Sequence, residues 1–196
     1  MPCRESEGTF ELAHYRREAD DLRAVIEHFS STNRVIPGII RHSKGGWSVL
    51  MYASKYDVCT VVNVSGRYDL KRGIVKHLGE DIMQKLGENG YKDLKDENGG
   101  ASYRVTKECV MDLPNTNMHA TCLHIDKDCK VLTVQGSEDE LTPVKEAYEF
   151  AKIIPNHKLR IVEGAGHGYI THQAELASIV LEFIKASLEQ DKPASS

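Results

Sequence analysis

Hydrophobic positions along the chain follow two patterns, one typical of amphipathic helices and one typical of buried strands. Apolar residues on one helical face predict helices over 14–30, 143–154 and about 171–188, and we also expect a helix over 44–55. Short runs rich in β-branched residues predict four strands, at 34–40, 58–65, 130–136 and 158–164. Strands and helices alternate, so the pattern predicts an α/β fold with a mostly parallel sheet between helices.

The stretch 67–118 departs from this rhythm, because it is polar, contains "GENG" and "DENGG", and shows no clean strand. We interpret it as a lid-like insertion within a single domain that spans 1–196, with a flexible tail at about 189–196. Pro37 lies inside the run 34–40 and weakens the prediction of a central strand there, because proline lacks an amide donor.

Composition narrows the classes of protein. The 196 residues are 40% hydrophobic and 28% charged, which is typical of a globular protein. The formal net charge is -4 with both signs mixed along the chain, so the charge pattern does not indicate a nucleic-acid-binding surface. No apolar stretch reaches the roughly 20 residues of a membrane helix, and "MPCRESEG" lacks a signal-peptide core. The cysteines are odd in number and widely spaced, so we expect reduced thiols and a cytoplasmic protein: Cys3, Cys59, Cys109, Cys122 and Cys129.

The stretch "IIRHSKGGWS", 39–48, places Ser43 between a predicted strand and a predicted helix. A sharp turn there exposes its residue at the carboxyl edge of the sheet, where α/β proteins bind ligands. Ser43 followed by Gly45 is most of the G-x-S-x-G nucleophile elbow, in which glycine lets the helix approach the strand. A serine that caps the following helix is an equally good explanation of this stretch alone.

Two further residues follow predicted strands in the order typical of a Ser-Asp-His triad. Asp139 lies in the loop after 130–136, and His167 lies between two glycines after 158–164. Parallel strands bring such loops to one edge, so Ser43 as nucleophile, His167 as base and Asp139 as acid would meet there. Read alone, Asp139 is also compatible with a turn or capping residue, and His167 with a solvated histidine.

Several motifs resemble the plant α/β-hydrolase proteins related to the serine aminopeptidase and monoglyceride-lipase group. They are spread from about residue 5 to 185: "HSKGG", "VVNVSGRYDLKRGI", "GSEDELTPV", "AKIIPNHKL", "GAGH" and "HQAELASIVLEFIK". The resemblance implies a three-layer α/β-hydrolase fold, assigns Ser43, Asp139 and His167 to the triad, and includes His42 in the elbow. It also implies that the backbone N–H of Lys44 is an oxyanion donor and that 67–118 forms the lid.

The chain departs from that family pattern at two places. Arg41 stands where the resemblance implies glycine, and a strained turn has little room for its side chain. "RESEGTF" resembles a segment that follows the fourth strand of such proteins, so we expect an N-terminally shortened fold without the loop that supplies the second oxyanion donor. Loss of one such donor typically costs about 10²–10³ in rate.

Other constellations add no chemistry. The cluster at 118–129 has spacings that do not match paired zinc ligands: His119, Cys122, His124 and Cys129. We interpret the basic run at 66–73 as a solvated turn, and we expect no cofactor and no metal.

Two functions therefore stay open. The first is a serine hydrolase that acts on a carboxylic ester, thioester or small acyl substrate through an acyl-enzyme. The second is a shortened, catalytically weak or inactive homologue that binds a small ligand or a protein partner. With the run 34–40 at one rim of the sheet, we also expect a homo-oligomer through that exposed edge.

Overall fold

The computed structural model describes the chain over the following residues: 15–70, 72, 79, 81–86, 89–95, 102–112 and 117–190. The chain divides into two compact units. The larger comprises Tyr15–Tyr68 and Met118–Ser196, and the smaller comprises Met1–His14 and Asp69–Asn117. The predicted lid region falls largely in the smaller unit, and the residues at 191–196 of the predicted tail lie outside the described ones.

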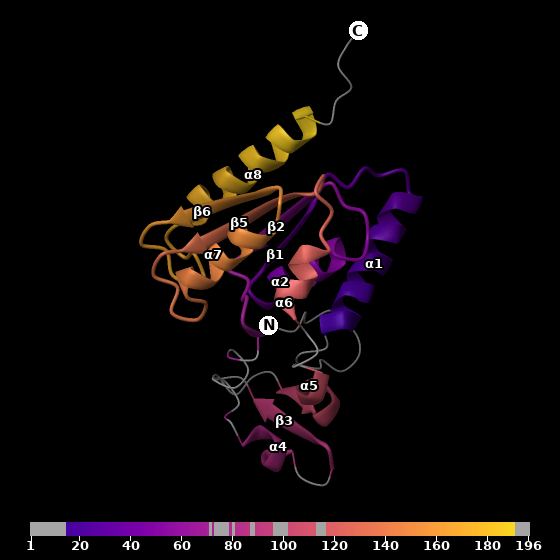
Figure 1. The fold of residues 1–196 in the computed structure, drawn as a ribbon, viewed down its shortest axis with the longest axis vertical. Coiled ribbons are helices and arrows are strands. Elements are labelled where there is room, and N and C mark those ends of the chain that lie inside the picture. Colours follow the sequence, from indigo (N-terminus) through magenta and orange to yellow (C-terminus); the bar gives the residue numbers. More distant parts are fainter. Residues whose placement is uncertain are drawn as a thin grey trace. The chain divides into compact units, whose positions relative to one another are not determined.

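A parallel sheet of four strands forms the centre of the larger unit (Figure 1). The strands lie in the order β1 (Ile39–His42), β2 (Thr60–Val64), β5 (Lys130–Gly136) and β6 (His157–Val162). Each neighbouring pair is parallel. The carboxyl ends of all four strands therefore lie at one edge, and the loops that follow them meet there.

Helices cover both faces of this sheet. The larger unit contains α1 (Tyr15–Ser31), α2 (Lys44–Ala53), α6 (Met118–Leu123), α7 (Val144–Ile153) and α8 (Gln173–Gln190). Successive residues of a strand point to opposite faces. On β2, Val62 packs in a core cluster with Phe183 of α8, whereas the neighbouring Asn63 faces Gly46 of α2. The helices α8 and α2 thus lie on opposite faces, which gives three layers and confirms the predicted α/β fold with a parallel sheet.

The first strand is the least well predicted element of this sheet. It covers Ile39–His42 instead of 34–40, and residues 34–38 form no regular structure. Val35, which the apolar pattern assigned to the strand, is 86% exposed. Pro37 explains the shift, because its ring nitrogen cannot donate to a strand ladder.

The smaller unit contains α4 (Ile82–Lys85), α5 (Lys107–Asp112) and an antiparallel pair, β3 (Tyr91–Lys95) and β4 (Ser102–Thr106). The prediction that 67–118 holds no clean strand is therefore wrong. Polar cross-strand contacts support the pair: Arg104 donates to both carboxylate oxygens of Asp93, at 2.9 and 3.0 Å, and its guanidinium lies 4.0 Å from the ring centre of Tyr91.

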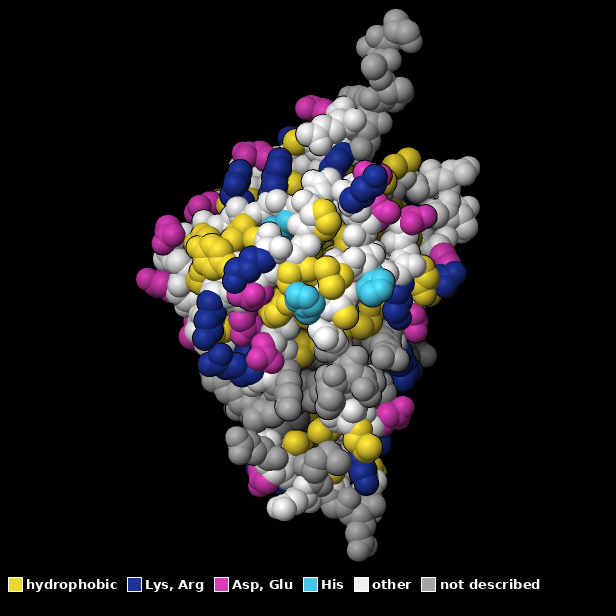
Figure 2. Space-filling view, in the orientation of Figure 1, with side chains coloured by type: hydrophobic (Ala, Val, Ile, Leu, Met, Phe, Trp, Pro, Cys, Tyr) yellow, Lys and Arg dark blue, Asp and Glu magenta, His cyan; other side chains and the backbone are white. Residues whose placement is uncertain are grey.

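The surface of the described residues carries mixed charge. On the face drawn in Figure 2, lysine and arginine side chains lie interspersed with aspartate and glutamate. Among the described helices, none combines the length and the apolar character needed to cross a membrane.

Candidate active site

Ser43 occupies the sharp turn that joins β1 to α2. Its φ of 58° and ψ of −125° place a non-glycine residue in the sparsely populated left-handed half of the backbone map. Two backbone hydrogen bonds hold the turn: the N–H of Ser43 donates to the carbonyl oxygen of Val64 at 2.7 Å, and the N–H of Gly46 donates to the carbonyl oxygen of Ser43 at 3.0 Å. The Ser43 hydroxyl makes no capping bond to α2, so its side chain is available for another contact.

The start of α2 packs tightly against the neighbouring strand. A Cβ atom at Gly46 would lie 2.1 Å from Oδ1 of Asn63, which is fully buried in β2. The close approach of helix to strand predicted for Gly45 is made by both glycines, by Gly45 toward Arg41 of β1 and by Gly46 toward Asn63 of β2. Lys44 begins the helix, and its ammonium pairs with Glu18 of α1, whose carboxylate also accepts a 2.8 Å hydrogen bond from Ser48.

Arg41 is accommodated beside the turn. Its side chain is exposed and runs along Gly45, where an added Cβ would lie 3.0 Å from both Cβ and Nε of Arg41. In the family pattern, a glycine at the position of Arg41 leaves room in the turn. Here Gly45 leaves the room that the Arg41 side chain occupies.

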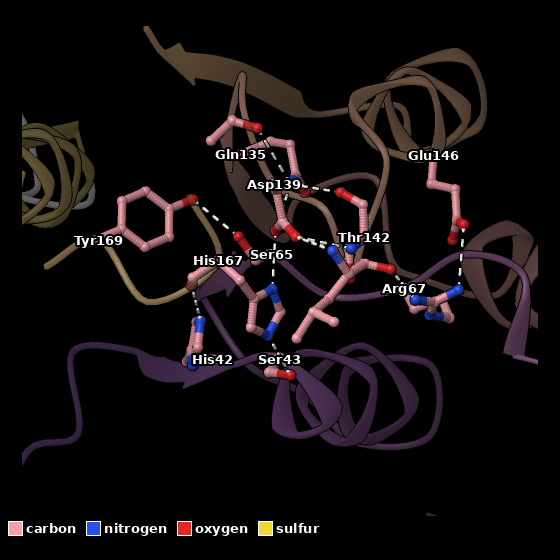
Figure 3. A network of polar contacts seen from close by, with 12 residues as sticks. His42, Ser43, Ser65, Arg67, Gln135, Asp139, Thr142, Glu146, His167 and Tyr169 are labelled. Carbon is pink, nitrogen blue, oxygen red and sulfur yellow. Dashed lines mark hydrogen bonds and ion pairs between the residues drawn. The ribbon is translucent and has the colours of Figure 1, made fainter. Parts of the chain in front are cut away.

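Ser43, His167 and Asp139 lie in hydrogen-bonding contact (Figure 3). Nε2 of His167 lies 2.8 Å from Oγ of Ser43, and Nδ1 of His167 lies 2.8 Å from Oδ2 of Asp139. The three residues follow β1, β6 and β5 respectively, so the parallel sheet brings together loops that are far apart in the sequence. The arrangement can pass a proton from the serine hydroxyl to the imidazole.

The carboxylate of Asp139 is buried and accepts hydrogen bonds at both of its oxygens. Its side chain has no exposed surface. Oδ1 accepts from the backbone N–H groups of Leu141 at 3.0 Å and Thr142 at 2.7 Å, and Oδ2 accepts from Nε2 of Gln135 at 2.8 Å. Burial would raise the pKa of Asp139, but the hydrogen bonds from His167, Thr142 and Gln135 outweigh it and hold the pKa below its ordinary value. Asp139 is therefore ionised at neutral pH.

His42, the elbow residue before Ser43, contacts the loop of the base. Burial lowers the pKa of His42, so its ring is neutral at neutral pH. Its Nε2 donates a 2.8 Å hydrogen bond to the carbonyl oxygen of His167. This bond therefore joins the elbow, through the side chain of His42, to the backbone of His167, the base.

Several polar residues around the triad were not predicted. Tyr169 and Ser65, which both have positive φ, share a buried 2.9 Å hydrogen bond between their hydroxyls (Figure 3). Gln135 had a visible signal, since an amide inside the apolar strand "KVLTVQG" needs a buried partner. The prediction of a solvated turn at 66–73 is wrong for Arg67, whose side chain is only 19% exposed and pairs with Glu146.

The His/Cys cluster at 118–129 has other contacts. His119 shares a 3.0 Å hydrogen bond with the hydroxyl of Tyr68, and His124 bonds to the carbonyl of Ala120 at 2.7 Å. Burial raises the pKa of Cys122 to about 12. Within the described ranges, no three His, Cys, Asp or Glu side chains are grouped as metal ligands. The cysteines in these ranges are all free thiols: Cys59, Cys109, Cys122 and Cys129.

Comparisons with known proteins agree with this architecture. No protein-family model matches the sequence, and no curated protein matches it. Among solved structures, the chain is similar to Est1E from Butyrivibrio proteoclasticus, with a TM-score of 0.69 and 20% identity over 87% of this chain and 69% of that one.

Two further structures are similar. The esterase domain of a Rhodothermus marinus protein has a TM-score of 0.61 and 20% identity, over 83% of this chain and 66% of that one. The alpha/beta hydrolase GrgF from Penicillium sp. sh18 has a TM-score of 0.69 and 16% identity, over 93% of this chain and 74% of that one. The chain therefore has the α/β-hydrolase fold.

Proposed function

We propose that this protein is a serine hydrolase that cleaves a carboxylic ester, thioester or small acyl substrate. The observation that carries the proposal is the continuous contact from Ser43 through His167 to Asp139, with 2.8 Å at each step. The esterases among the similar structures support an ester as the first substrate class to test.

In the proposed reaction, Oγ of Ser43 attacks the carbonyl carbon of the substrate while its proton passes to Nε2 of His167. The resulting imidazolium faces the ionised carboxylate of Asp139, which stabilises its charge. His167 then gives the proton to the leaving alcohol or thiol, and an acyl group remains on Ser43. Water, deprotonated by His167, attacks this acyl-enzyme, and the acid product leaves as Ser43 regains its proton.

The tetrahedral intermediate carries a negative charge that needs donors. Lys44 is the first residue of α2, so its backbone N–H lies at the positive end of that helix, directly after the nucleophile. We assign this N–H as one oxyanion donor. A preorganised donor of this kind contributes about 10²–10³ in rate.

The direct test is labelling with a fluorophosphonate probe, followed by mass-spectrometric identification of the modified residue. We expect Ser43 to react faster than any other hydroxyl. Ser43→Ala should abolish labelling, whereas Ser54→Ala, which changes a serine bonded to the Met51 carbonyl after α2, should leave it unchanged. A folded protein that is not labelled, or is labelled equally without Ser43, would favour a ligand-binding or partner-binding homologue.

A further inference from the structure

The half-buried Arg67, which follows β2, contacts the segment that carries the acid of the triad. We call residues 139–142 the acid loop. Nη2 of Arg67 donates a hydrogen bond to the carbonyl oxygen of Leu141, inside this loop. The other terminal nitrogen, Nη1, lies 3.6 Å from Oε1 of Glu146 (Figure 3). The guanidinium therefore joins the acid loop to α7.

Glu146 orients this guanidinium. The residue is 5% exposed, and its Oε2 accepts a 2.8 Å hydrogen bond from the backbone N–H of Tyr68, the residue after Arg67. One carboxylate thus contacts both the side chain of Arg67 and the backbone that follows it. A charge-assisted contact of this kind, largely removed from solvent, restricts the directions in which Arg67 can donate.

The acid loop is fixed through its carbonyl groups as well as its amides. The amides of Leu141 and Thr142 donate to Oδ1 of Asp139, which turns Oδ2 toward His167. The carbonyl of Thr142 accepts a 3.0 Å hydrogen bond from Gln135. The carbonyl of Leu141 accepts from Arg67 and shares its peptide group with the N–H of Thr142, so one of the two peptide groups that hold the acid is bonded directly from the loop after β2, and the peptide group that follows it is bonded from β5.

We propose that Arg67 is a positioning residue, which holds the acid loop through the Leu141 carbonyl and thereby keeps Asp139 directed at His167. The inference rests on the proposed function of the triad. Loss of this support would let the loop move away from the aligned geometry, and a misplacement of about 1 Å can cost about 10²-fold in rate.

The test compares Arg67→Ala and Arg67→Lys with Arg160→Met, which changes an exposed arginine on β6. Three quantities are measured in the full chain: the rate constant of fluorophosphonate labelling, kcat and KM for p-nitrophenyl acetate, and the downfield proton resonance of the His167 Nδ1–H hydrogen bond. We expect Arg67→Ala to lower kcat and the labelling rate by about 10–100-fold, with KM little changed. The resonance should broaden or disappear, and millimolar guanidinium should restore part of the rate.

Arg67→Lys keeps the charge but replaces the planar fork by one ammonium group, so we expect an intermediate loss. If Arg67→Ala does not fold, the rates and the resonance measured on Arg67→Lys test the proposal instead. Wild-type rates and an unchanged resonance in a folded Arg67 variant would overturn the proposal. An unreactive Ser43 in the wild-type protein would refute the proposed function instead, while the resonance in the Arg67 variants would still show whether Arg67 positions Asp139.

Discussion

Asp139→Asn is the most demanding test of the proposed triad, because donors converge on both oxygens of the carboxylate. Oδ1 accepts two backbone N–H groups, whereas Oδ2 accepts from Gln135 and faces Nδ1 of His167. Asparagine has the same shape, but one of its two ends is an amide NH₂ and can only donate. Whichever way the new side chain turns, its NH₂ group must therefore face at least one donor.

The two orientations have different costs. With the NH₂ toward the amides of Leu141 and Thr142, two backbone hydrogen bonds are lost. With the NH₂ toward His167 and Gln135, only the Gln135 bond is lost, because the imidazole can change tautomer and accept at Nδ1. The proton then resides on Nε2 of His167, which can no longer take a proton from Ser43. We expect kcat to fall by about 10⁴-fold, as for other triads with a reversed tautomer, which corresponds to about 5.4 kcal/mol of barrier.

The assay measures kcat for p-nitrophenyl acetate and the fluorophosphonate labelling rate in the same preparations, with circular dichroism to show that each variant is folded. Asp126→Asn is the matched control, since it removes an equal charge from an exposed aspartate that accepts a 2.7 Å hydrogen bond from the N–H of Asp128. The control should retain the wild-type rate. A folded Asp139→Asn protein within tenfold of wild type would refute the reasoning, because His167 would then not depend on the carboxylate.

Three other predictions concern stability and association. Burial lowers the pKa of His157 to about 4, below the ordinary value of about 6.5, so the unfolded chain binds the proton more tightly than the folded one. The free energy of unfolding measured in urea should therefore decrease as the pH is lowered from about 6.5 to 4, by up to about 3 kcal/mol. His157→Gln should flatten this dependence. Arg41→Gly should leave the labelling rate unchanged, because the exposed Arg41 side chain is already accommodated over Gly45, and should lower the thermal unfolding midpoint slightly, because glycine in a strand costs conformational entropy; a faster labelling rate would show that Arg41 crowds the elbow. Strand β1 pairs with β2 and, within the described residues, with no second strand, so light scattering at micromolar concentration should detect a dimer or larger species, and a monomer would contradict this expectation.

The sequence predicts the central sheet well because its strands carry local signals. β5 has the predicted bounds, 130–136, and its apolar run is buried almost throughout. The β3–β4 pair could not be predicted in this way, because "YKDLK" is polar and its stability comes from contacts such as that between Asp93 and Arg104, which a local pattern does not reveal. The partial burial of Arg67 was missed for the same physical reason, since its partner Glu146 lies in a helix far along the chain.

The same distinction separates the residues of the candidate site. Ser43, Asp139 and His167 were predictable because each lies in the turn or loop after a strand, and the order of these loops along the chain can be read from the sequence. The hydrogen bonds around them join segments that are far apart in the sequence: His42 donates to the carbonyl of His167, and Arg67 donates to the carbonyl of Leu141. Each of these bonds depends on two segments that become neighbours only after the sheet has formed. A single sequence can therefore identify the groups that react, whereas the groups that set their geometry become visible only in the folded structure.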